Sequence, residues 1–139
     1  MTLDLGSLKK ALSSLESALQ VASPDSMSMQ NKKAQDVIKA GVIQNFEFTY
    51  ELCWKFMTRW LESNMGATYV EGVTRRELFR RAVENRLIAD VDDWMEYHDA
   101  RNETSHTYDA DKAEEIFQVS QNFFPDAKHL LEALEQRND

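Results

Sequence analysis

The sequence has few residues that interrupt helices or cross-link a chain. It contains four glycines and two prolines among 139 residues. This scarcity favours long helices, because glycine and proline are the residues that end or interrupt a helix most effectively. The single cysteine, Cys53, excludes an internal disulfide, and without His or Cys neighbours at ligand spacing it forms no zinc site. We therefore interpret Cys53 as a small buried apolar side chain.

The chain also lacks a long apolar run and an excess of positive charge. No segment approaches the roughly 18 apolar residues of a membrane-spanning helix, and residues 1–10 do not combine a basic start with an apolar stretch. We therefore expect a soluble, cytoplasmic protein without membrane contact. The net charge of −8, from 16 basic and 24 acidic residues, argues against a broad nucleic-acid surface, because phosphate neutralisation supplies most non-specific affinity. Any contact with RNA must be local.

The remaining composition is typical of a globular helical protein. Hydrophobic residues make up 42% of the chain and charged residues 29%, and the length suits one domain with one core. We therefore expect a single domain over residues 1–139. No segment alternates β-branched and polar residues as a strand would. The sequence predicts an all-α fold, an up-and-down bundle of about five helices with a long central second helix.

The spacing of apolar residues predicts where these helices lie. They are expected at Leu3–Val21, from between Met27 and Gln30 to about Asn64, at Arg75–Asn85, at Val91–Glu103 or slightly beyond, and at Lys112–Gln136 with Pro125 as a kink or break. The second helix would be about 50 Å long. Between Phe46 and Leu61 it carries an apolar arc wider than one neighbouring helix covers, so it is central or also lines a subunit interface.

Short polar segments mark the expected helix ends. Residues 23–26 (Ser-Pro-Asp-Ser) predict a turn after the first helix, because proline disfavours helix in the residue before it. Thr74 with Glu77, and Asp111 with Glu114, match the capping box, in which the first side chain accepts a free backbone N–H and the glutamate reaches back. Helices three and five should begin at these two positions.

The densest group of reactive side chains lies in residues 94–108, WMEYHDARNETSHTY. Arg101 can hold a phosphate through two parallel hydrogen bonds, Asn102 can orient a hydroxyl or a water, and the imidazole of His106 can accept or donate a proton. These groups suffice for metal-independent cleavage of a phosphodiester. His106 would exchange a proton with the ribose 2′-hydroxyl or the leaving oxygen, while Arg101 stabilises charge on the phosphate.

Spacing alone also allows a structural role for the same residues. Arg101 would pair with the acids of the second helix, where Glu47, Glu51 and Lys55 follow at four-residue steps, and His106 would cap the fourth helix. On a regular helix Arg101 and His106 lie about 140° apart. A helix that unwinds before His106, or a site shared across a two-fold homodimer, would bring them together.

Three further groups have alternative interpretations. His98, Asn102 and His106 share a helix face, but no carboxylate or cysteine completes a metal site, so we expect neither metal nor cofactor. Five arginines form a cluster that is more typical of a solvated face than of a phosphate site: Arg75, Arg76, Arg80, Arg81 and Arg86. Four aromatic residues form a stripe more typical of a core than of a base-stacking surface: Phe46, Tyr50, Trp54 and Trp60.

Several segments taken together resemble one known family. They are FEFTYELCWK at 46–55, TRREL at 74–78, Trp94, and RNETSHTY at 101–108. In order and spacing over almost the whole chain they resemble the nucleotidyltransferase substrate-binding proteins, within the HEPN superfamily. An Arg-x4-His pattern alone would be weak evidence, whereas the full set of segments is specific.

This resemblance implies a helical bundle, a homodimer and a separately encoded minimal nucleotidyltransferase as partner. Members with an Arg-x4-His-x-Tyr motif, matched here by Arg101, His106 and Tyr108, resemble ribonuclease toxins of toxin–antitoxin modules. In those modules the nucleotidyltransferase neutralises the toxin by adding AMP to the motif tyrosine, which would be Tyr108. Candidate binding residues beside it are Ser105, Glu47, Glu51 and Lys55.

The expected ligand is therefore RNA or a nucleotide, and two functions remain open. The first is a metal-independent RNase held in check by its partner. The alternative is a noncatalytic subunit that binds a nucleotide or substrate for the transferase. A purely helical interaction protein would leave the cluster around Arg101 and His106 unexplained.

Overall fold

The structure is a computed structural model, and it describes residues 2–138. This part of the chain contains six α-helices, two short 3-10 helices and no strand. The elements are α1 (Gly6–Val21), α2 (Pro24–Ser28), α3 (Lys32–Met65), η1 (Ala67–Tyr69), α4 (Arg75–Glu84), α5 (Val91–Asn102), η2 (Thr104–His106) and α6 (Ala110–Gln136). The predicted all-α class is confirmed. No helix within residues 2–138 is both long and apolar enough to cross a bilayer.

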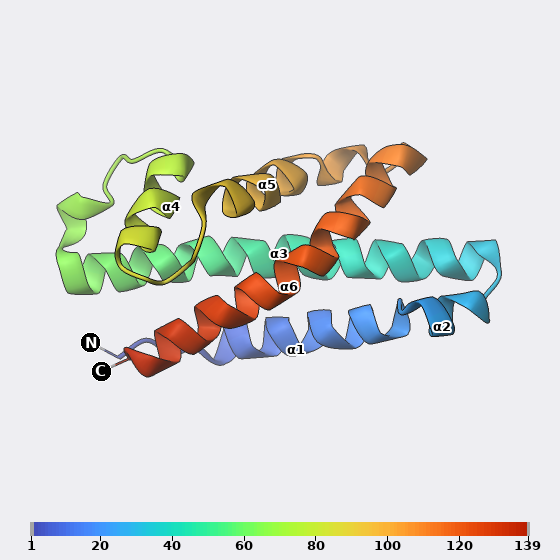
Figure 1. Ribbon diagram of the computed structural model, residues 1–139, viewed down its shortest axis with the longest axis horizontal. Coiled ribbons are helices and arrows are strands. Elements are labelled where there is room, and N and C mark those ends of the chain that lie inside the picture. Colours follow the sequence, from blue (N-terminus) through green and yellow to red (C-terminus); the bar gives the residue numbers. More distant parts are fainter. Residues whose placement is uncertain (1, 139) are drawn as a thin grey trace.

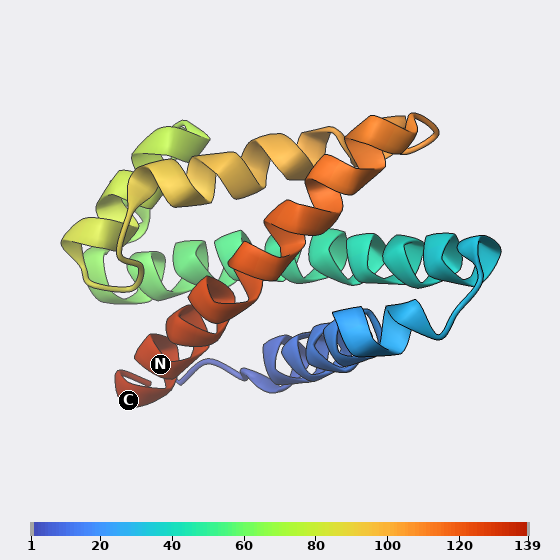
Figure 2. The ribbon, with the colours of Figure 1, turned by 45° about the vertical axis from the view of Figure 1, so that its right-hand side comes forward.

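The helix α3 forms the axis of the bundle. It has 34 residues, and α1 lies antiparallel to it on one side while α5 runs antiparallel to it on the other (Figure 1). The last helix, α6, crosses the bundle diagonally, from the end of α5 to the start of α1 (Figure 2). Leu3 and Asn138, near the two ends of the chain, meet there. The Leu3 N–H donates to the Asn138 side-chain oxygen at 2.7 Å, and the Asn138 side-chain nitrogen donates to the Leu3 carbonyl oxygen at 2.9 Å. The predicted up-and-down bundle around a long helix is therefore confirmed.

The segment expected to be only a turn after α1 is itself a short helix. The Ser23 hydroxyl accepts the Ser26 N–H at 3.4 Å, and Pro24 occupies the first helical position, where its fixed φ is favourable and no N–H is needed. The long helix then begins at Lys32 rather than between Met27 and Gln30, because Asn31 caps it and accepts the Ala34 N–H at 2.8 Å. The bundle therefore contains one helix more than the five expected.

The helix boundaries elsewhere lie within a few residues of those predicted. Thr74 caps α4 as expected, accepting the Glu77 N–H at 3.1 Å. The second capping box is wrong, because Asp109, not Asp111, caps α6 and accepts the Lys112 N–H at 3.3 Å. α6 also continues through Pro125 without a break. Packing of its buried face against α1, α3 and α5 holds the helix together across the hydrogen bond that proline cannot make.

The wide apolar arc of α3 is covered by its neighbours. Its buried members are Phe46, Tyr50, Cys53, Phe56, Met57, Trp60 and Leu61, while Trp54 is partly exposed. α3 contacts α1, α4, α5 and α6, so the arc is that of a central helix. The interpretation of the aromatic stripe as core is confirmed for its buried members. Cys53 is fully buried, and burial raises the pKa of its thiol, so the side chain is an uncharged apolar group as expected.

Trp94 of α5 is the centre of the aromatic core. Its ring centroid lies 5.3 Å from that of Tyr97, 5.7 Å from Phe123, 5.8 Å from Phe79 and 6.5 Å from Tyr50. These contacts join α3, α4, α5 and α6 through one side chain. The position of α5, and of the polar residues at its end, therefore depends on Trp94.

We expect Trp94→Ala to lower the free energy of unfolding by about 3–5 kcal/mol, because it removes a fully buried ring and leaves a cavity. Urea denaturation followed by circular dichroism measures this loss. Phe48→Ala is the matched control. Phe48 is a 59% exposed aromatic residue, and its removal should change stability by no more than about 0.5 kcal/mol. A loss below about 1 kcal/mol for Trp94→Ala would contradict the packing described here.

Candidate functional site

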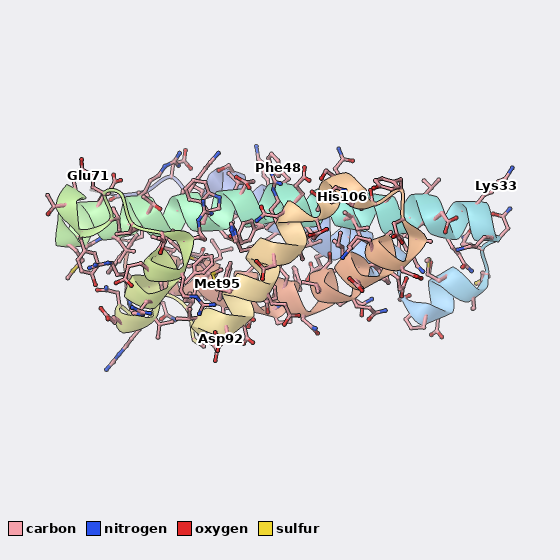
Figure 3. The ribbon with its side chains drawn as sticks, turned by 90° about the horizontal axis from the view of Figure 1, so that it is seen from above. Lys33, Phe48, Glu71, Asp92, Met95 and His106 are labelled. Carbon is pink, nitrogen blue, oxygen red and sulfur yellow. The ribbon has the colours of Figure 1, made fainter. Side chains whose placement is uncertain are left out.

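The predicted reactive residues lie where α5 ends. The α-helix stops at Asn102, Glu103 follows, and Thr104–His106 form the 3-10 helix η2. The backbone conformation therefore changes between Arg101 and His106, and the 140° separation of a regular helix no longer applies. Figure 3 shows His106 in this turn, alongside α3. α5 thus ends before His106, as one of the two arrangements considered for Arg101 and His106 requires.

Arg101 is held by Glu51 of α3. Its Nε lies 2.9 Å from one carboxylate oxygen of Glu51, and the Trp54 indole N–H donates to the other oxygen at 3.1 Å. Both charged side chains are about one-third exposed (33% and 31%), so the pair adds no more than about 1 kcal/mol to stability. Within residues 2–138 the two terminal nitrogens of Arg101 have no hydrogen-bond partner. Pairing with Glu51 thus orients Arg101 and leaves its outer donors available for an anion.

The Glu47 carboxylate contacts the turn after α5, whereas Arg101 is paired with Glu51. The Thr104 hydroxyl donates to the Glu47 carboxylate and also lies 2.8 Å from the carbonyl oxygen of Arg101. This contact fixes η2 against α3. Lys55 is exposed, and its ammonium lies 5.8 Å from the ring centroid of Trp54, the residue that hydrogen-bonds Glu51. Ser105 is exposed, and its side chain makes no hydrogen bond within the described chain.

His106 and Tyr108 are both exposed and adjacent. Their ring centroids are 6.0 Å apart with the planes nearly perpendicular, and Tyr108 is 86% exposed. Neither side chain has a hydrogen-bond partner among residues 2–138, and none joins Arg101 to His106. The imidazole and the phenol are therefore accessible to a ligand from solvent.

A hydrogen-bonded network behind Asn102 was missed by the sequence analysis. The Tyr50 hydroxyl lies 2.9 Å from Nδ1 of His98, and Nε2 of the same ring lies 3.3 Å from the Asn102 amide nitrogen. Burial and the nearby Arg75 lower the pKa of His98, which favours the neutral ring. The four-residue spacing of His98 and Asn102 signalled their contact, but nothing in the sequence pointed to Tyr50. His106 lies outside this network because α5 ends first.

A pocket of about 670 Å³ opens between α3, η2 and the start of α6. Tyr108, Thr104 and Glu47 line one part of it. In another part Lys39 bonds Glu114 at 2.7 Å, and this contact lowers the pKa of Glu114. The volume lies within the usual range for small-molecule sites. Within residues 2–138 no three His, Cys, Asp or Glu side chains group in a way that could hold a metal ion.

A comparison with known protein families shows the family to which this chain belongs. A family model described as nucleotidyltransferase substrate binding protein like matches residues 3–136. The chain belongs to this family. The resemblance inferred from the motif segments is thereby confirmed, and the match covers every helix of the bundle.

One named relative and two solved structures are similar to this chain over most of its length. A protein of Haemophilus influenzae named "Probable ribonuclease HepT" is 38% identical over 138 residues, which cover 98% of this chain and 94% of that protein. A solved structure from Haemophilus influenzae, described as the fold of a substrate binding domain of a nucleotidyltransferase, superposes with a TM-score of 0.87 at 36% identity, covering 95% of this chain and 99% of that one. A Thermus thermophilus structure superposes at 0.74 with 26% identity, covering 91% and 98%.

Proposed function

We propose that this chain is a cytoplasmic, metal-independent endoribonuclease that acts as the toxin of a two-component module. The observation that carries the proposal is the arrangement at the end of α5, where Glu51 orients Arg101 at 2.9 Å and the exposed His106 follows in η2. An oriented guanidinium with unpaired donors suits a phosphate, and an accessible imidazole suits proton transfer. The ribonuclease name of a relative at 38% identity supports this choice.

The proposed reaction uses the ribose next to the cleaved bond. His106 removes the proton of the 2′-hydroxyl, the 2′-oxygen attacks phosphorus, and the bond from phosphorus to the 5′-oxygen breaks. The departing 5′-oxygen takes up a proton, so the products are a 2′,3′-cyclic phosphate and a free 5′-hydroxyl. Arg101 stabilises the negative charge that grows on the phosphate oxygens. Asn102, held by His98 at 3.3 Å, orients the attacking hydroxyl.

We propose that the active form is a homodimer. The reaction moves one proton onto a base and another onto the leaving oxygen, and each chain supplies one His106. A two-fold dimer would bring two such residues to one substrate. The 59% exposed Phe48, one residue from Glu47 on α3, offers an apolar contact near the site for this association.

The proposed partner is a separately encoded minimal nucleotidyltransferase, which neutralises the chain by adding AMP to Tyr108. The phenol oxygen would attack the α-phosphate of ATP, pyrophosphate would leave, and the phenolic proton would be lost. Tyr108 is 86% exposed and lies 6.0 Å from His106 between ring centroids. A bulky anion attached there would occupy the space in front of His106 and repel an RNA phosphate.

The alternative function is a noncatalytic subunit that presents a nucleotide to the transferase. The observation that favours it is the 670 Å³ pocket beside Tyr108, in whose lining Lys32 pairs with Asp36 and Lys39 with Glu114. The description of the Haemophilus influenzae structure as a substrate binding domain agrees with this reading.

Incubation of the purified chain with single-stranded RNA, with and without EDTA, separates the two functions. We expect cleavage that EDTA does not reduce, because the proposed chemistry uses only Arg101, Asn102 and His106. Mass spectrometry should find 2′,3′-cyclic phosphate ends. Intact RNA from a folded protein that binds ATP in calorimetry would favour the subunit instead.

A further inference from the structure

The arginines that cluster around α4 differ in their partners. Three of them pair with acids: Arg76 with Asp92 at 3.2 Å, Arg80 with Glu77 at 2.8 Å, and Arg81 with Glu77 at 3.3 Å. Arg76 and Arg80 are exposed and match the interpretation as a solvated face, whereas Arg81 is partly buried against the Tyr69 ring. Arg86 is exposed. Arg75 and Arg81 are both partly buried, but Arg75, at the first position of α4, faces α3 and has no acidic partner within residues 2–138.

Arg75 has an aromatic neighbour in place of an acidic one. Its guanidinium lies 3.8 Å from the ring centroid of Trp54, and within residues 2–138 no carboxylate approaches it within 4.0 Å. Its one side-chain hydrogen bond, to the Tyr50 hydroxyl, is long at 3.5 Å. A partly buried charge is usually compensated by an acid. Stacking covers the face of the guanidinium and leaves the N–H donors at its edge available for an anion.

The same side chains link Arg75 to the proposed reactive residues. Trp54, which Arg75 covers, donates its indole N–H to Glu51 at 3.1 Å, and Glu51 holds Arg101 at 2.9 Å. Tyr50, the hydrogen-bond partner of Arg75, contacts His98 at 2.9 Å. Two guanidinium groups thus share a framework in which Glu51 is the only carboxylate bonded to either of them within residues 2–138.

We propose that Arg75 forms a second phosphate-binding subsite, which holds an RNA backbone phosphate next to the one bound by Arg101. This inference rests on the proposed ribonuclease function and adds a substrate contact to it. The rigid stack on Trp54 fixes the guanidinium before RNA arrives, so little side-chain entropy is lost on binding. A second contact also explains how a protein of net negative charge binds RNA. Two oriented arginines supply a local attraction for the phosphates that the net charge does not.

The test compares Arg75→Met with Arg76→Met, both in a His106→Ala background so that cleavage does not interfere. Both variants remove one positive charge from adjacent positions of α4, and methionine keeps an unbranched apolar stem. The probe is a short fluorescein-labelled single-stranded RNA, and the readout is the dissociation constant from fluorescence anisotropy at several salt concentrations. Arg75→Gln is measured alongside, and circular dichroism checks that each variant is folded.

We expect Arg75→Met and Arg75→Gln to weaken RNA binding by about tenfold and to reduce the salt slope by about 0.7, the value of one phosphate contact on a single strand. Arg76→Met should keep both quantities near those of the background. Equal binding by folded Arg75 and Arg76 variants would overturn the subsite and leave the ribonuclease proposal standing. Absence of RNA binding by the background protein itself would overturn both.

Discussion

Replacing His106 with alanine should reduce RNA cleavage by the purified chain by about 10²–10⁴-fold, the usual contribution of a positioned general acid or base. The imidazole is exposed in η2 and forms no hydrogen bond within residues 2–138, so its removal takes away the proton carrier without disturbing the fold. Cleavage of a fluorescent RNA under single-turnover conditions measures the loss. The thermal midpoint of the variant should stay close to that of the unaltered chain.

His129→Ala is the matched control for this experiment. His129 is also exposed, but it lies on α6 beside Asp93 and Asp126, in a different surface hollow from His106. Its replacement should leave the cleavage rate unchanged within about twofold, as for a surface residue outside the site. Full activity in His106→Ala would refute the proposed proton transfer. Equal loss in both histidine variants would point to a general effect on the fold.

Replacing Tyr108 with phenylalanine should prevent neutralisation by the partner nucleotidyltransferase while RNA cleavage continues. The substitution removes only the hydroxyl that accepts AMP, and the ring is 86% exposed, so stability should not change measurably. Incubation with the nucleotidyltransferase and ATP, followed by mass spectrometry of the intact chain, should show AMP on the unaltered protein and none on the variant. In cells the variant should arrest growth even when the partner is present.

Tyr69→Phe provides the comparison for this second prediction. The Tyr69 hydroxyl is engaged with Glu84 at 3.2 Å and Asn85 at 3.1 Å near α4, so it is a poor acceptor, and the variant should still gain AMP. If Tyr108→Phe gained AMP to the same extent, another residue would be the acceptor. If it gained none yet was still neutralised, the partner would act by binding alone.

Together the proposals describe a site with an internal support on α3. Glu51 orients Arg101, Glu47 holds the turn through Thr104, and Tyr50 contacts the histidine behind Asn102. These α3 residues lie within one turn and a half of helix, so one rigid element sets the geometry of the end of α5 and of η2. Replacement of Glu47 or Glu51, which are partly exposed, should therefore affect activity more than stability, whereas Tyr50 also belongs to the buried core.

The sequence by itself determined the elements of this protein. Apolar spacing, scarce glycine and proline, and the Thr74 cap located the five main helices within a few residues of their observed limits, because these are local properties of the backbone and of helix periodicity. The motif segments identified the family. Local signals failed at Pro24, which starts a short helix where a turn was expected, and at Asp109, which caps α6 in place of Asp111.

Only the tertiary structure decided which polar groups meet. The sequence allowed Arg101 to pair with the acids of the second helix, and the structure confirms this pairing across 50 residues and selects Glu51 over Glu47. The contact of Tyr50 with His98, across 48 residues, was not expected from the sequence. Arg75 and Arg76 are adjacent in sequence, yet one stacks on Trp54 and the other pairs with Asp92, because successive residues of a helix point 100° apart. Such contacts depend on how the helices cross, and the aromatic core around Trp94 sets that crossing.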